Sequence, residues 1–154
     1  MRAIIPPLMR FRAAVFFIGA ALFAGVALAN EAALPPRPEA AEIEALWNAG
    51  KKSQAERKLD RWMKQEKKSP WPWVQSAVLE YRQKKYKQSL ARLKAALEKD
   101  PNCAEAYYWR GKNYEAQNKP MDAANEYRAA LMAEAKFNEA QEALDRVLAL
   151  LGSS

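Results

Sequence analysis

The chain has 154 residues, of which 50% are hydrophobic and 28% are charged, and its 25 Lys and Arg against 18 Asp and Glu give a formal charge of +7. This composition is not that of a disordered chain, and the length suits one small domain. The absence of histidine excludes His-based triads, His general bases and His metal ligands, and the single cysteine, Cys103, excludes an internal disulfide and a Cys-rich zinc site.

Residues 1–29 have the pattern of a secretory signal peptide. Three arginines lie within the first 12 residues, an apolar run follows over residues 13–26, and residues 27–29 form a small-x-small triplet. This order predicts export and cleavage after Ala29. An uncleaved anchor in the inner membrane stays open, because the apolar run reaches the short limit of a spanning helix. No Asn-x-Ser/Thr sequon occurs, which favours the bacterial periplasm over a glycosylating compartment.

Charge is unevenly distributed after the signal segment. Residues 30–38 (NEAALPPRP) predict a proline-stiffened linker. Residues 51–99 hold fifteen Lys and Arg against five Asp and Glu, whereas residues 30–50 and 100–154 are each net negative by three. A basic stretch is typical of nucleic-acid binding, but an exported protein rarely meets nucleic acid, so an acidic partner or an anionic surface is the better match.

One 34-residue unit recurs three times. Residues 36–69, 70–103 and 104–137 align without a gap, with small residues at Ala55, Ser89 and Ala123 and large ones at Leu59, Leu93 and Tyr127. Each unit shows helical spacing of apolar residues on both sides of a polar turn. We therefore predict three helix–turn–helix repeats, whose helix pairs break near Gly50, Gln83–Lys85 and Asn118–Pro120.

The segment after the third repeat continues the helical pattern. Residues 138–152 carry apolar residues at helical spacing and charged residues on the opposite face, as a terminal capping helix requires. Together with the three repeats, this segment predicts seven helices and no strand in the mature chain.

The third unit carries the most regular motif. Its aromatic and small residues are Tyr107, Gly111, Tyr114, Ala123, Tyr127 and Ala130. This pattern resembles the tetratricopeptide repeat (TPR) family, and the resemblance covers residues 36–137, although the first unit departs from it with Trp62 where the family usually has Ala. The resemblance implies an all-α fold, a right-handed superhelical solenoid of three helix–turn–helix repeats plus a C-terminal capping helix.

In this family the first helices of successive repeats line a concave groove that binds a protein or peptide. Carried over to this sequence, the groove residues are Trp47, Tyr81, Arg82, Tyr108, Trp109, Lys112 and Glu115. Because one helix cannot point three consecutive residues inward, at least one of Tyr108 and Trp109, which follow Tyr107, is expected to face away from the repeat core. The family's subgroup that clamps chaperone tails uses Lys and Asn at places occupied here by Val74, Val78 and Tyr108, so that subgroup is not indicated.

These observations predict an exported, non-enzymatic adaptor or scaffold that binds a protein or peptide in the groove, with a basic flank at Lys84, Lys85 and Lys87 and with no cofactor or metal. Cys103 is expected to be an incidental thiol, because its acidic neighbours raise its pKa. Two alternatives stay open. The Lys/Arg-rich middle could dock on an anionic membrane or cell-envelope polymer, or the chain could be an anchored subunit of an envelope assembly. The identity and oligomeric state of the complex do not follow from the sequence.

Overall fold

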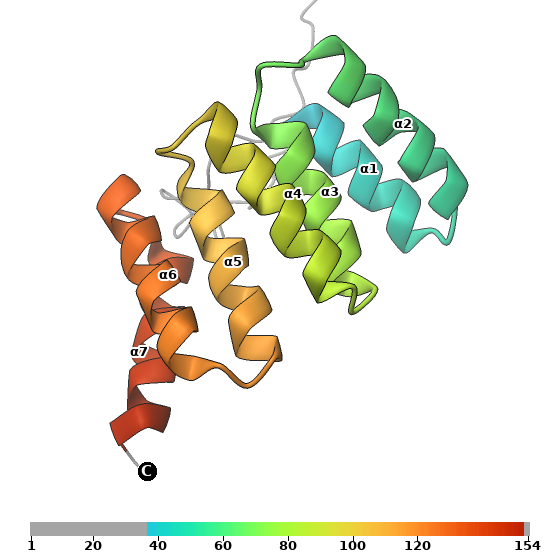
Figure 1. Ribbon diagram of the computed structural model, residues 1–154. Helices are drawn as coiled ribbons and strands as arrows, with labels where there is room; N and C mark the ends of the chain where they lie inside the picture. Colours follow the sequence, from blue (N-terminus) through green and yellow to red (C-terminus); the bar gives the residue numbers. More distant parts are fainter. Residues whose placement is uncertain (1–36, 153–154) are drawn as a thin grey trace, which may run out of the picture. The chain divides into compact units, whose positions relative to one another are not determined.

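A computed structural model describes residues 37–152, and this part of the chain contains seven α-helices and no strand, as the sequence predicts. The helices are α1 (Pro38–Asn48), α2 (Lys52–Gln65), α3 (Trp71–Arg82), α4 (Tyr86–Lys99), α5 (Ala104–Ala116), α6 (Pro120–Ala133) and α7 (Asn138–Gly152). Helices α1 and α2, α3 and α4, and α5 and α6 pack as pairs, and α7 packs on α6 (Figure 1). The predicted all-α helical-repeat fold is confirmed.

The predicted signal peptide, residues 1–29, lies outside the described residues, as does the linker up to residue 36. Pro38, predicted as the last linker residue, is instead the first residue of α1. Proline is favoured there because its missing N–H would have no partner in the first turn of a helix. None of the seven described helices is long and apolar enough to cross a membrane.

The turns inside the three helix pairs repeat one backbone conformation at the predicted breaks. Gly50, Lys84 and Asn118, spaced by 34 residues, have φ of 75°, 59° and 58°. Each of these amides donates a hydrogen bond to a carbonyl oxygen of the preceding helix, for example from Lys84 N to Tyr81 O at 2.8 Å. Glycine adopts this left-handed region without a steric penalty, asparagine tolerates it and lysine rarely does, so the repeat geometry overrides local preference at Lys84.

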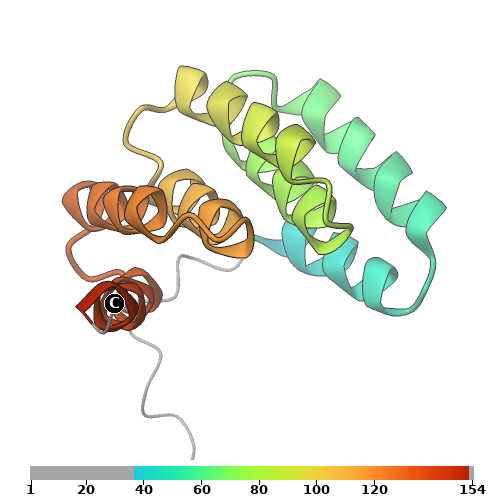
Figure 2. The same cartoon turned by 60° about the horizontal axis from the view of Figure 1, so that its bottom comes forward.

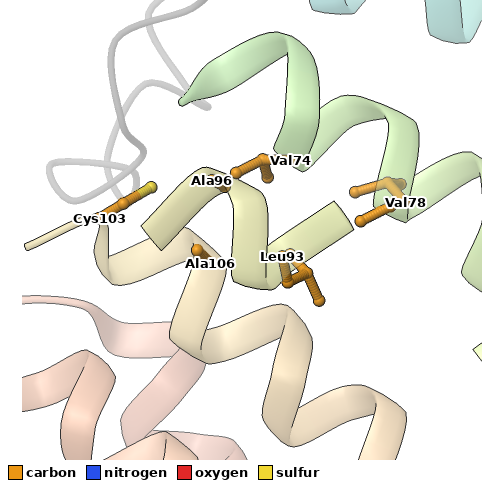
Figure 3. Close-up of a cluster of buried hydrophobic side chains, with 7 residues drawn as sticks. Val74, Val78, Leu93, Ala96, Cys103 and Ala106 are labelled. Atoms are coloured by element: carbon orange, nitrogen blue, oxygen red, sulfur yellow. The ribbon is translucent and has the colours of Figure 1, made fainter. Parts of the chain in front are cut away.

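Successive helix pairs stand side by side in chain order (Figure 2), with direct packing of α2 on α3, of α4 on α5 and of α3 on α5. A single helix pair cannot bury both of its apolar faces, and this stacking completes the core. One central cluster comes from α3, α4 and the start of α5 (Figure 3), and its buried members are Val74, Ala77, Val78, Leu93, Ala96, Cys103 and Ala106.

The aligned small and large positions of the repeats meet inside the core. Ala55, Ser89 and Ala123 are fully buried, as are Leu93 and Tyr127 among the aligned large residues. A Cβ on Gly111 would lie only 2.5 Å from Cε1 of Tyr127. Position 111 therefore has no room for a side chain, because the Tyr127 ring occupies the space beside it.

Candidate binding groove

A cavity of about 300 Å³ is lined by residues of α1, α3 and α5, with Arg37 before α1 and one residue of α2. Its lining residues are Arg37, Ala40, Ala41, Glu44, Trp62, Trp71, Val74, Gln75, Val78, Glu105 and Trp109. We call this space the α1–α3–α5 cavity. Three of the lining residues are tryptophans, and the other eight are divided equally between apolar and polar or charged side chains.

The repeat period places equivalent positions around this cavity. Arg37, Trp71 and Glu105 are spaced by 34 residues, and so are Ala41, Gln75 and Trp109. Because each repeat turns the same face of its first helix toward this space, residues that are far apart in sequence share one cavity. The side chains at equivalent positions differ, so the cavity has three chemically distinct sides.

One wall of the cavity carries an ion pair. The Arg37 guanidinium lies over the Trp71 ring, and its Nη1 is 3.7 Å from Oε2 of Glu105. The pKa of Glu105 is raised to about 7, mainly by burial; Arg37 opposes the increase, and nearby carboxylates including Glu44 add to it. The Glu105 carboxyl therefore changes protonation state close to neutral pH.

Two hydrogen-bond donors among the lining residues have no acceptor. Gln75 is 6% exposed and Trp62 is 4% exposed. Within residues 37–152, neither the Gln75 Nε2 nor the Trp62 Nε1 has a hydrogen-bond partner. A buried donor without an acceptor costs about 1–3 kcal/mol, and most buried polar groups in native proteins are paired. Both nitrogens have almost no accessible surface, so these donors are buried behind the cavity lining.

The structure brings three of the predicted groove aromatics together. The ring centroids of Tyr81 and Trp109 are 5.4 Å apart, and those of Tyr108 and Trp109 are 5.7 Å apart. Only Trp109 of the predicted groove set lines the α1–α3–α5 cavity. Tyr108 instead packs on Phe137, at a centroid distance of 5.1 Å. Tyr108 and Trp109 are both half-buried, and each contacts a core cluster, so neither is a freely exposed anchor.

The other predicted groove residues lie apart from this cavity. Trp47 lines a second cavity, of about 360 Å³, beside Leu79 and Glu80. Arg82 Nη2 is 3.3 Å from the Glu44 carboxylate, which ties α3 to α1. Lys112 is half-buried on α5 and does not line either cavity.

Glu115 has partners on two other helices. It accepts a hydrogen bond from the Tyr127 hydroxyl at 2.7 Å and two from the Arg146 guanidinium at 3.1 and 3.0 Å. Burial by itself raises the pKa of Glu115, but the hydrogen bonds from Arg146 and Tyr127 outweigh it and hold the pKa below its ordinary value. This carboxylate therefore connects α5 to α6 and α7 and is not free to bind a ligand.

The predicted basic flank lies at the turn between α3 and α4. Lys84, Lys85 and Lys87 are exposed, and Lys85 Nζ donates to Gln83 Oε1 at 2.8 Å. The cavity lining on α3 runs from Trp71 to Val78, and the flank begins beyond the C-terminal end of this helix, so none of the three lysines lines the cavity.

Cys103 is the N-cap residue of α5 and is 2% exposed. Burial raises the pKa of its thiol to about 12, with smaller contributions from Glu105 and Asp100. The expectation of a raised pKa is confirmed, although its main cause is burial. No group of three or more acidic or Cys side chains arranged to hold a metal ion occurs among residues 37–152.

Sequence reasoning did not identify Arg37, Trp71, Gln75 and Glu105 as site residues. It predicted core packing for Trp62, which is confirmed by its place in a buried cluster, although Trp62 also lines the cavity. The sequence did contain a usable signal. Gln75 lies one 34-residue repeat before Trp109, and Arg37, Trp71 and Glu105 are equivalent positions four residues earlier in each repeat, on the same helix face. Following that register around the predicted groove would have found this cavity. The unpaired state of the two donors is visible only in three dimensions.

Comparisons with known proteins agree on the fold. Residues 79–118 match the family model of the TPR repeat, and no curated protein sequence matches the chain. The first TPR domain of human RPAP3 is 22% identical, with a TM-score of 0.65, over 75% of this chain and 91% of that one. The first TPR of Spaghetti (RPAP3), bound to the HSP90 peptide SRMEEVD, is 21% identical, with a TM-score of 0.63, over 74% and 90%.

The TPR2B domain of yeast Sti1, from a structure described as its complex with pHsp70, is 17% identical to this chain. The TM-score is 0.60, and the match covers 73% of this chain and 98% of that one. At these identities the solved structures show a shared fold. The described part of the chain thus has the fold of tetratricopeptide-repeat domains, and its residues 79–118 match the model of that repeat.

Proposed function

We propose that this protein is an exported, non-enzymatic adaptor that binds a segment of another protein in the α1–α3–α5 cavity. The observation that carries the proposal is an aromatic cavity that is built from equivalent positions of three repeats and lined by Trp62, Trp71 and Trp109. Buried aromatic side chains surrounded by a polar rim are typical of binding hot spots. The Spaghetti domain of the same fold is described with a bound HSP90 peptide, which supports this type of use.

The chemistry of the described residues supports binding over turnover. The chain has no histidine, and the Cys103 thiol is buried with its pKa raised to about 12, so it is a poor nucleophile at neutral pH. Among residues 37–152, the cavity lining has Arg37, Glu44 and Glu105 as its charged residues and contains no Ser, Thr, Cys, Lys or Tyr. Such a site can position a ligand but has few of the groups that a reaction requires.

The proposed export rests on the pattern of residues 1–29, and the proposed compartment is the bacterial periplasm. N-terminal sequencing of the protein isolated from its native cells tests this part. A first residue of Asn30 is the expected result. Retention of the signal segment would instead favour the anchored subunit of an envelope assembly.

A second candidate function is supported by one surface. Lys84, Lys85 and Lys87 are exposed together at the α3–α4 turn, where they could meet an anionic membrane or cell-envelope polymer. This alternative predicts that changing all three lysines to alanine abolishes binding and that changing Trp109 has no effect.

Site-specific photocrosslinking in the native cells tests the proposed site. Ala41 is exposed and lines the cavity, whereas Met132 on α6 is 88% exposed and lies outside it, so each is replaced in turn by the photocrosslinker benzoylphenylalanine. The proposal predicts one defined adduct from position 41 that is absent from position 132. Trp109→Ala should abolish the adduct in a variant that keeps its helical circular dichroism, whereas the triple lysine change should mainly slow its formation. Equal labelling from both positions would contradict the proposed site.

A further inference from the structure

Residues 51–99 are strongly basic, yet most of their few carboxylates converge on one cavity. This stretch holds fifteen Lys and Arg against five Asp and Glu. Three of the five, Glu56 and Asp60 on α2 and Glu80 on α3, line the second cavity of about 360 Å³, to which Trp47 also belongs. We call this space the α2–α3–α4 cavity. Among the described residues, its lining has no member in common with that of the α1–α3–α5 cavity.

Two of these three carboxylates are not paired with a cation of the chain. Glu80 is paired with Arg92, whose Nε is 3.2 Å from its Oε1, and the other cation of the lining, Lys85, donates to a glutamine. Glu56 and Asp60 are exposed, and neither forms an ion pair within residues 37–152. They are four residues apart on α2, so they lie on one side of this helix. The cavity therefore offers two accessible carboxylates to a cationic ligand.

A buried hydroxyl is a second, independent sign of a ligand. Ser76 lines the same cavity and is only 6% exposed. Its hydroxyl forms no hydrogen bond within residues 37–152, whereas the buried Ser89 hydroxyl donates to Ala77 O at 2.9 Å. Unlike the unpaired nitrogens of Gln75 and Trp62, the Ser76 oxygen is not one of the atoms without accessible surface. A donor inside the cavity can therefore reach it, and most buried polar groups in native proteins are paired.

The arrangement of these acceptors favours a planar organic cation over a metal ion. Within residues 37–152 no three acidic or Cys side chains are close enough to hold a metal ion, so the acceptors are spread along the cavity wall. A guanidinium has five N–H donors in one plane, whereas an ammonium is a compact charge with three. Trp47 adds a flat ring on which a guanidinium can stack, and Lys52 Nζ already lies 5.2 Å from its centroid.

The next junction between repeats shows that the acidity is not a general property of this fold. A cavity of about 470 Å³ is lined there by residues of α4 and α5. Its residues 34 positions after Glu56, Asp60 and Ser76 are Leu90, Lys94 and Arg110. The same repeat position is therefore acidic at the first junction and basic or apolar at the second.

We propose that the α2–α3–α4 cavity binds an arginine side chain from a basic segment of a partner protein. Glu56, Asp60 and Ser76 accept hydrogen bonds from its guanidinium, and Trp47 packs on its plane. The residues around this cavity are strongly basic, so a basic segment is repelled elsewhere on this stretch and attracted only here, which makes the contact specific. This site does not depend on the function proposed for the α1–α3–α5 cavity.

The indole N–H signals in a ¹⁵N-correlated NMR spectrum test this proposal on the purified protein. The probe is a short peptide of alternating glycine and arginine, acetylated at one end and amidated at the other, and the same peptide with lysine in place of arginine is compared with it. We expect the arginine peptide to shift the Trp47 signal in a saturable manner and to bind more tightly than the lysine peptide. The signal of Trp109, which lines the other cavity, should stay in place.

Variants that remove the same charge inside and outside the cavity sharpen the test. Glu56→Gln combined with Asp60→Asn should weaken the affinity about tenfold, the effect of two lost ion pairs. Glu66→Gln combined with Glu98→Gln is the matched control, because these exposed residues are the other two acids of the same basic stretch and do not line the cavity. This control should change the affinity less than about twofold. Ser76→Ala, which leaves the charge unchanged, should weaken it about threefold.

Several results would overturn the proposal. A Trp47 signal that does not respond to the arginine peptide would mean that the cavity binds no such side chain. Equal weakening by the two double changes would assign the binding to overall charge, and equal affinity for the lysine peptide would remove the role of the planar guanidinium. A shift of the Trp109 signal instead of the Trp47 signal would place the peptide in the other cavity. The crosslink from position 41 tests that other cavity separately, so failure of either experiment is distinguishable from failure of the other.

Discussion

The polar groups on the two sides of helix α5 differ in whether they have hydrogen-bond partners. Toward α6 and α7, the Glu115 carboxylate accepts hydrogen bonds from Tyr127 and Arg146, so these three groups satisfy one another. Toward α1 and α3, Trp109 shares a cavity with Gln75 and Trp62, whose donors have no acceptor. The first side fixes the architecture of the third repeat and α7. The second side instead borders an open cavity lined by three tryptophans, as a binding site requires.

The largest predicted effect is a loss of stability caused by overpacking between α5 and α6. Gly111→Ala places a Cβ about 2.5 Å from the Tyr127 ring, which is fully buried and cannot move away. We expect the free energy of unfolding to fall by about 3 kcal/mol, at the upper end of the usual range for overpacking. Urea denaturation monitored by circular dichroism measures this loss. Gly152→Ala is the control and should be nearly neutral, because nothing lies within 4 Å of the place that the added methyl group would take; an equal loss in both variants would contradict the close fit of α5 on α6.

The second prediction compares a carboxylate that is hydrogen-bonded to two other helices with an exposed ion pair. Glu115→Ala leaves the buried Tyr127 hydroxyl without an acceptor, so we expect a loss of about 2 kcal/mol. Arg82→Ala removes the pair with Glu44, whose side chains are 33% and 38% exposed, and should cost less than about 1 kcal/mol. Thermal unfolding of both variants under one set of conditions makes the comparison. A larger loss for Arg82→Ala would mean that α3 and α1 are held together more strongly than α5, α6 and α7.

The contrast between paired and unpaired polar groups also explains how much of the structure could be predicted from the sequence. The 34-residue period determines where small residues face large ones, so the seven helices and the turns at Gly50, Lys84 and Asn118 were predictable. The period does not reveal which polar side chains find partners. Glu115 belongs to the groove by its register, yet Arg146, which is 31 residues away on α7, pairs with it.

The candidate site was predicted only in part for a related reason. Trp109 was found because it is a conspicuous aromatic residue beside two others, whereas Gln75 is an ordinary polar residue in sequence and becomes informative only through its burial and its missing acceptor. Trp62 departs from the family pattern in the first repeat, and it lines the cavity as well as belonging to a buried cluster. A departure from a repeat pattern was therefore a signal for the site in this case.

The third prediction uses the pH dependence of stability at the cavity wall. The folded state holds the Glu105 pKa near 7, above the ordinary value of 4.5, so between these values the folded protein binds more protons than the unfolded chain. The contribution of Glu105 to the free energy of unfolding is therefore fully present below about pH 4.5 and is lost as the pH rises to about 7. Glu105→Gln should flatten this part of the curve and raise stability at pH 8 by on the order of 1 kcal/mol.

Thermal unfolding measured between pH 4 and 8 checks this prediction. Glu142→Gln, a change of the same charge at an exposed site on α7, is the control and should leave the slope unchanged. If both variants alter the slope equally, the dependence reflects overall charge, and the cavity wall has no special role.

The most direct test of the account compares two single changes by stability and by partner binding. Gln75→Leu removes an unpaired buried donor, whereas Ser89→Ala removes a hydroxyl that donates to Ala77 O and accepts from Asn113 Nδ2, both at 2.9 Å. We predict that Gln75→Leu keeps or slightly raises the free energy of unfolding and weakens formation of the position-41 crosslink. Ser89→Ala should lower stability by about 1 kcal/mol and leave the crosslink unchanged. A Gln75→Leu variant that loses stability and keeps its crosslink would contradict the claim that Gln75 contributes to binding in the α1–α3–α5 cavity.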